Sequence, residues 1–182
     1  MSLRLQLRER TQTAHGRLDA LWRIDRLRER EPYTQFLQAT ASALVPLEAR
    51  LQSGGVEKLL PDWPARSRAA SVVDDLAGLG AGFSPATAPA LDGAAAQFGA
   101  LYVLEGSRLG GSLIAREVAR SGDPAVLANR RYLGHGKAGR LWNDLLDRLE
   151  RLPAAELERL CRGALETFAL FEVAAREVLV TS

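Results

Sequence analysis

The sequence predicts an all-α protein, with a single domain over residues 1–182. Three observations support this prediction. Apolar residues recur every three or four positions through most of the chain, which is the spacing of one helix face. Period-two alternation bounded by turn residues, which is typical of strands, does not occur. Pro, Gly and Ser gather between the periodic segments, as in the expected loop over 80–93.

About six or seven helices are expected. Pro32 suits the first turn of a helix, and Gly54 and Gly55 suit the end of the same helix. Pro153 separates the last two helices. In chain order, the main helices are expected over residues 3–28, 31–53, 65–79, 93–120, 138–152 and 154–179.

The composition excludes several classes of protein. A formal net charge of +2 is not that of a typical nucleic-acid-binding protein. The one cysteine, Cys161, excludes an intramolecular disulfide and fits a reducing compartment. The N-terminal segment lacks the apolar region of a signal peptide, and no apolar run reaches the roughly 18 residues that span a membrane. We therefore expect a soluble, cytoplasmic protein.

The central stretch LYVLEGSRLGGSLIAREVAR carries Gly106, Gly110 and Gly111 inside a predicted helix. Each internal glycine costs roughly 1 kcal/mol relative to alanine. A helix that accepts this cost is typically bent or closely approached by another group. Two explanations stay open: close packing against another helix, and a flat ligand lying against the backbone.

The chain has two histidines. His15 lies on the apolar face of the first helix, and Asp19 lies one turn later, where its carboxylate can reach the imidazole. Such a carboxylate orients a metal-ligating histidine and raises its basicity. The alternative is a core histidine that is hydrogen-bonded to a nearby carbonyl. His135 lies between glycines in GHGKAG and is expected to be solvated, without a chemical role.

Several other kinds of site are poorly supported. The Glu-x-x-His pairs of dinuclear carboxylate centres are absent, and one cysteine with two distant histidines is too few ligands for zinc. A G-x-S-x-G nucleophile motif is also missing. One histidine for an iron and a glycine-rich helix for a flat ligand point to haem. Arg8, roughly 10 Å along the axis from His15, could pair with an anionic edge of that ligand.

These motifs resemble a known family. LYVLEGSRLGGSLIARE resembles the distal-helix motif of bacterial haem oxygenases, and LRERTQTAHGRLD resembles their proximal-helix motif. The order and separation of the two motifs match as well, and so does the closing helix LETFALFEVAAREV, so that the resemblance covers essentially the whole chain. The chain is most similar to the bacteriophytochrome-associated and pseudomonad branch, which carries Glu-Gly-Ser on the distal helix.

The resemblance implies a haem sandwiched between a proximal helix and a kinked distal helix. It implies oxidative cleavage of that haem to biliverdin, carbon monoxide and ferrous iron, with O2 and external electrons. Haem is then both cofactor and substrate. The implied site residues are the iron ligand His15 with its orienting acid Asp19, the distal residues Gly106, Ser107, Gly110 and Gly111, and the propionate-binding residues Arg8, Tyr102 and Arg140.

The resemblance also implies partners. A ferredoxin or flavoprotein reductase would supply the electrons, and the first 30 residues, with eight Arg against four acids, offer it a basic docking face. Arg8 favours the α isomer of biliverdin. Two fates of the product stay open, namely supply to a bacteriophytochrome and release during iron acquisition. No nucleic-acid or membrane partner is expected.

Ser107 occupies the position at which many haem oxygenases carry an aspartate that organises proton delivery. Serine can hold a water molecule but does not titrate, so a non-catalytic haem carrier or sensor with the same fold stays open as an alternative. A third hypothesis is an all-α interaction protein in which His15 and the glycines serve only packing.

Overall fold

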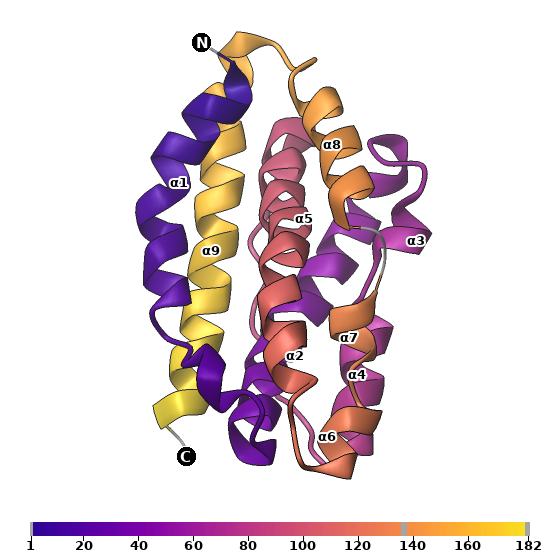
Figure 1. The fold of residues 1–182 in the computed structure, drawn as a ribbon. Helices are drawn as coiled ribbons and strands as arrows, with labels where there is room; N and C mark the ends of the chain where they lie inside the picture. The colour runs from indigo at the N-terminus through magenta and orange to yellow at the C-terminus, as the bar shows by residue number, and fades with distance from the viewer. Residues whose placement is uncertain (1, 136–137, 181–182) are drawn as a thin grey trace.

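The computed structural model describes residues 2–135 and 138–180. Within these ranges no strand occurs, which confirms the all-α prediction. No helix in this part of the chain combines the length and apolarity needed to cross a bilayer. The longer helices in Figure 1 are α1 (Leu3–Asp19), α2 (Arg30–Ser53), α4 (Ala69–Gly78), α5 (Gly93–Val118), α8 (Ala138–Leu149) and α9 (Leu157–Val180). The shorter ones are α3 (Trp63–Arg66), α6 (Pro124–Ala128) and α7 (Arg131–Gly134).

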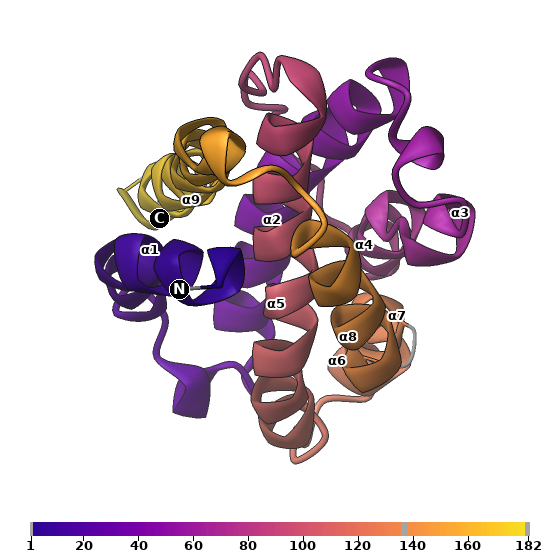
Figure 2. The same ribbon diagram turned by 90° about the horizontal axis from the view of Figure 1, so that it is seen from above.

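Helix α9 holds the long helices together. It packs along α5 on one side and along α1 on the other, and it also contacts α2 (Figures 1 and 2). Helix α5 runs through the middle of the molecule, and α8 and α7 lie on its other flank (Figure 2). Because α1 and α5 each pack on α9, their side chains can face each other across the space between them.

Two glycines that the sequence analysis did not single out allow α5 and α9 to approach closely. A Cβ on Gly99 of α5 would overlap the carbonyl oxygen of Leu160 and lie 2.6 Å from the backbone nitrogen of Ala164. A Cβ on Gly163 of α9 would overlap the carbonyl oxygen of Ala96. Backbone atoms cannot move aside as side chains can, so these two positions require glycine.

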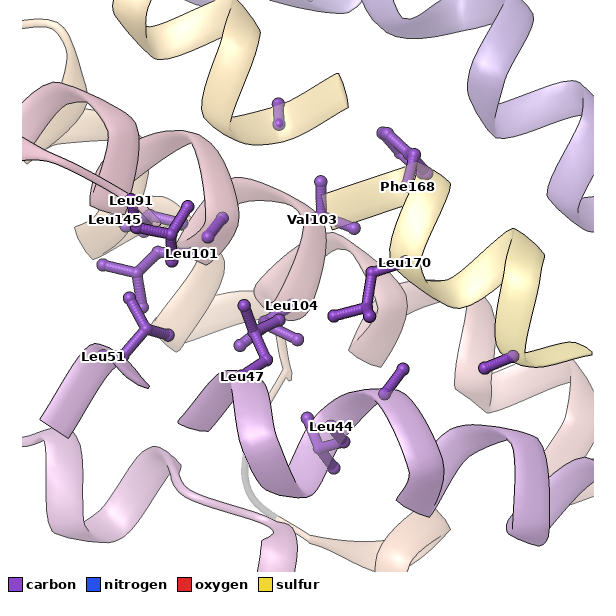
Figure 3. Close-up of a cluster of buried hydrophobic side chains, with 14 of the residues drawn as sticks. Leu44, Leu47, Leu51, Leu91, Leu101, Val103, Leu104, Leu145, Phe168 and Leu170 are labelled. Carbon is purple, nitrogen blue, oxygen red and sulfur yellow. The ribbon is translucent and has the colours of Figure 1, made fainter. Parts of the chain in front are cut away.

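Buried leucines fill the space between the long helices. Figure 3 shows Leu44 and Leu47 of α2 close to Leu104 of α5 and Leu170 of α9. Leu44 and Leu47 have no exposed surface, and Leu104 is also buried. Each such side chain contributes roughly 1.5–3 kcal/mol through burial. This apolar packing fixes α5 relative to α9 and thereby the walls of the site described below.

The first helix is shorter than predicted. It ends at Asp19 rather than near residue 28, because the next backbone N–H groups bond three residues back: Leu21 to Leu18 at 3.2 Å and Trp22 to Asp19 at 3.2 Å. A 3₁₀ turn over Ile24–Arg26 follows. The turn brings Trp22 edge-on against Phe36 of α2, with the ring centroids 5.4 Å apart. The apolar spacing that continued to Trp22 therefore does not mark one helix.

The predicted helix over 65–79 is two helices, α3 and α4, separated at Ser67 and Arg68. The buried carboxylate of Glu48, on α2, accepts hydrogen bonds from the backbone N–H groups of Arg68 at 2.8 Å and Ala69 at 3.0 Å. This carboxylate caps the first turn of α4, where the helix dipole favours a negative charge. The break also turns the Arg68 side chain inward.

Candidate functional site

A cavity of about 760 Å³ lies between α1 and α5. Its volume is within the range of roughly 300–1,000 Å³ that is usual for small-molecule sites. Its walls are mainly apolar and aromatic, with Trp22, Phe36, Trp142, Phe168 and Phe171 among the lining residues. The cavity is therefore suited to a large, flat and mostly apolar ligand.

His15 and Asp19 form the α1 wall. The Nδ1 atom of His15 lies 3.1 Å from Oδ2 of Asp19, as the spacing of four residues predicted. The imidazole also packs edge-on against Phe168, with the ring centroids 5.8 Å apart. Its side chain is 63% exposed, so the alternative of a core histidine bonded to a carbonyl is wrong. With Nδ1 on the carboxylate, Nε2 is the nitrogen that can bind a metal.

Gly106, Gly110 and Gly111 of α5 border the same cavity. A Cβ on Gly110 or on Gly111 would meet no atom within 4 Å, and a Cβ on Gly106 would lie 3.5 Å from the Trp142 ring, an ordinary contact. Helix packing therefore does not require glycine at these positions. Of the two explanations left open by the sequence, this geometry favours a ligand lying against the backbone.

Ser107 lines the cavity beside these glycines, and its hydroxyl is already engaged. It donates a hydrogen bond to the carbonyl oxygen of Leu104 at 2.7 Å and accepts one from Nη2 of Arg68 at 2.9 Å. The same Nη2 donates to the carbonyl oxygen of Leu104 at 2.8 Å. The Arg68 guanidinium lies 4.9 Å from the Tyr132 ring centroid, within the range of a cation–π contact.

Arg108 is a second buried cation on the α5 wall. Its Nε donates to Oε2 of Glu105 at 2.9 Å, and its Nη1 donates to the carbonyl oxygen of His135 at 2.8 Å. It also donates to the carbonyl oxygen of Arg66. Burial lowers the pKa of Arg108, and the neighbouring Arg68 acts in the same direction. Sequence reasoning did not identify Arg68 or Arg108, since local spacing does not show that both turn toward the cavity.

The prediction that His135 is a solvated residue is wrong. His135 lines the cavity, and its Nδ1 lies 3.2 Å from Nη1 of Arg108. Burial lowers the pKa of His135, and the positive charges of Arg108 and Arg68 lower it further. The imidazole is therefore neutral at pH 7. The flanking glycines suggested a solvated loop, but they carried no information about the buried arginine next to the ring.

The three residues expected at the haem propionates lie in different positions. Tyr102 lines the cavity, with its ring 5.1 Å from that of Trp142. Burial raises the pKa of the Tyr102 phenol, and the positive charge of the nearby Arg8 opposes that shift. Arg8 on α1 and Arg140 on α8 are exposed and do not line the cavity. Because α1 and α8 contact each other, both arginines belong to neighbouring helices.

Comparisons with known proteins agree with this architecture. No family model matches the chain. A haem oxygenase from Xanthomonas campestris is 36% identical over 86 residues, which are 47% of this chain. The match spans about half of that relative, 52% of its length. The crystal structures of the NO- and CO-bound haem oxygenase from Neisseria meningitidis share the fold, with a TM-score of 0.79 at 21% identity over 99% of this chain and 93% of that one. The chain therefore has the haem oxygenase fold.

Proposed function

We propose that this protein is a haem oxygenase that cleaves haem to biliverdin, carbon monoxide and ferrous iron with O2 and external electrons. The observation that carries the proposal is the position of the His15–Asp19 pair. It lies on one wall of an apolar cavity, and the glycines of α5 line another wall. The fold shared with the Neisseria enzyme and the similarity to the Xanthomonas enzyme support it.

The residues of the cavity fit haem. The Nε2 atom of His15 is not engaged by Asp19 and would be available for the iron, and the aromatic walls suit the apolar macrocycle. Bound haem supplies the iron at which O2 is activated, and its own ring is the substrate. The backbone of α5 at Gly106, Gly110 and Gly111 lines the cavity and would lie against the bound ligand.

Arg8, Arg140 and Tyr102 are proposed to pair with the two propionates. Arginine binds carboxylates through charge-assisted hydrogen bonds, which hold a ligand in one orientation. Tyr102 lies in the cavity wall, and the two arginines lie on α1 and α8 beside it. The orientation that they impose would select the ring edge that is attacked, and we propose the α isomer of biliverdin as the product.

The electron donor is proposed to be a ferredoxin or a flavoprotein reductase. Several arginines of the first 30 residues are already paired, as Arg10 is with Glu158 at 2.5 Å and Arg17 with Glu172 at 3.1 Å. Among the described residues, no carboxylate lies within 4.0 Å of the guanidinium groups of Arg4 and Arg8, and the carboxylate of Glu150 bonds the backbone N–H of Arg4 at 3.0 Å. We therefore place the docking face at this end of α1 rather than along the whole segment. Supply of the biliverdin to a bacteriophytochrome is part of the same proposal.

A single-turnover experiment tests the proposal. Purified protein is reconstituted with ferric haem, and ascorbate is added in air. We expect the Soret band to decay while biliverdin absorbance grows, and chromatography of the product to give one isomer. A haem spectrum that persists unchanged would overturn the enzymatic function and leave the haem carrier. Failure to bind haem at all would favour the interaction protein.

A further inference from the structure

The two walls of the cavity differ in charge. On the α1 side, the charged residue is Asp19, which is bonded to His15. On the α5 side, the charged lining residues among those the structure describes are Arg68 and Arg108. Glu105 is buried behind this wall and bonds Arg108 instead of lining the cavity. The α5 side therefore offers hydrogen-bond donors and positive charge, and no carboxylate.

The hydrogen bonding of His135 defines its tautomer. A guanidinium has donors only, so Nδ1 of His135 must accept the hydrogen bond from Nη1 of Arg108. The proton of a neutral imidazole is then on Nε2. The charged groups that act on this ring are Arg108 and Arg68, which favour the neutral form, and Glu48 and Glu105, which oppose them. Burial has the largest effect and also favours the neutral form.

Arg68 acts on His135 through its charge. The residue is only 4% exposed and lines the cavity. Its Nη2 donates to Ser107 and to the carbonyl oxygen of Leu104, which hold the guanidinium in place. The positive charge fixed there favours the neutral form of His135.

We infer that His135 donates a hydrogen bond into the cavity from the α5 wall and that Arg108 fixes it as the Nε2–H tautomer. The inference rests on the proposed function. This N–H group takes the place of the carboxylic acid that is absent at Ser107. It binds a hydrogen-bond acceptor in the cavity, either an ordered water molecule or an anion.

The first test uses the protein without haem, so it is independent of the proposed function. Because the chain has only two histidines, long-range ¹H–¹⁵N correlation spectra contain two imidazoles, and His135→Gln assigns them. We expect a neutral His135 at pH 7 with its proton on Nε2. In Arg108→Leu the tautomer preference is lost and the imidazole pKa rises. A protonated Nδ1 in the unmodified protein would overturn the inference.

The second test measures fluoride binding to the ferric haem complex by optical titration. Fluoride is used because its binding is strengthened by nearby hydrogen-bond donors. His135→Phe removes the donor and is expected to raise the fluoride dissociation constant about tenfold, as expected for the loss of one hydrogen bond to an anion. His135→Gln keeps an N–H group and is expected to retain most of the affinity.

Fluoride affinity that is unchanged in His135→Phe would overturn the inference even though haem binds. Loss of haem binding in the unmodified protein would instead contradict the proposed function, and the spectra of the haem-free protein would still test the tautomer.

Discussion

At the scale of single residues, the pairing of His15 with Asp19 is the feature that the sequence predicted best. Both residues lie on α1, so the helical repeat alone places the carboxylate beside the ring. The imidazole lines the cavity and its side chain is 63% exposed, so a ligand can reach it. Because the carboxylate engages Nδ1, Nε2 is the atom that would bind a metal.

Replacement of Asp19 by Asn is therefore expected to weaken haem binding by about 10–100-fold, the usual effect of removing the group that orients a metal-ligating histidine. The change is measured by absorbance titration of the haem-free protein. Asp25→Asn is a matched control, because Asp25 is an exposed acid that pairs with Arg23 and does not line the cavity. Equal affinities for the two variants would show that Asp19 does not act on the ligand.

The residues that the sequence did not identify belong to several elements. Arg68 lies between α3 and α4, Arg108 is on α5, and His135 follows α7. Their contacts join positions 27 and 39 residues apart, as between Arg108 and His135 and between Arg68 and Ser107. No local repeat relates such positions, and the inward turn of Arg68 depends on the break that Glu48 caps. These roles therefore could not be predicted without the tertiary structure.

At the scale of helices, the glycines of α5 fall into two kinds. Gly99 is required by the close approach of α9, whereas Gly110 borders the open cavity. The sequence indicated that α5 tolerates an unusual number of glycines for a helix interior, but it did not distinguish the two reasons. That distinction depends on which face of α5 meets α9, and this is a property of the packing.

The two kinds of glycine are expected to respond oppositely to alanine. Gly99→Ala forces its Cβ against backbone atoms of α9 and is expected to lower the free energy of unfolding by about 1–3 kcal/mol. Gly110→Ala, in the haem-free protein, is expected to raise it by up to about 1 kcal/mol, because alanine favours the helix and meets no atom.

Urea unfolding of both variants measures these changes. A haem titration completes the comparison, because a methyl group at position 110 projects into the ligand space and is expected to weaken binding. If Gly110→Ala were stabilising and bound haem as well as the unmodified protein does, the glycine would have no role in ligand contact.

At the scale of the whole molecule, the order of the helices and the central place of α5 were predictable from apolar spacing and from glycine and proline positions. The C-terminal end of the first helix and the split at Ser67 and Arg68 were not, because they depend on contacts with α2. The cavity arises from the same arrangement. Helices α1 and α5 both pack on α9, and the cavity lies between them next to His15.

A ligand in this cavity contacts α1, α5 and α9 together and is expected to stabilise the whole fold. At a free haem concentration of 100 times the dissociation constant, the stabilisation is about 2.7 kcal/mol, which corresponds to a rise in Tm of about 5–10 °C for a chain of this size. Differential scanning calorimetry with and without haem measures it. A Tm that does not depend on haem concentration would contradict binding of haem in this cavity.

The most direct test of the account is the identity of the iron ligand. Haem titrations are compared for the unmodified protein, His15→Ala and His135→Ala, followed by addition of free imidazole. We predict that His15→Ala loses the Soret spectrum of a histidine-ligated haem and regains it with imidazole, whereas His135→Ala keeps it. An unchanged spectrum in His15→Ala would contradict the placement of haem between α1 and α5.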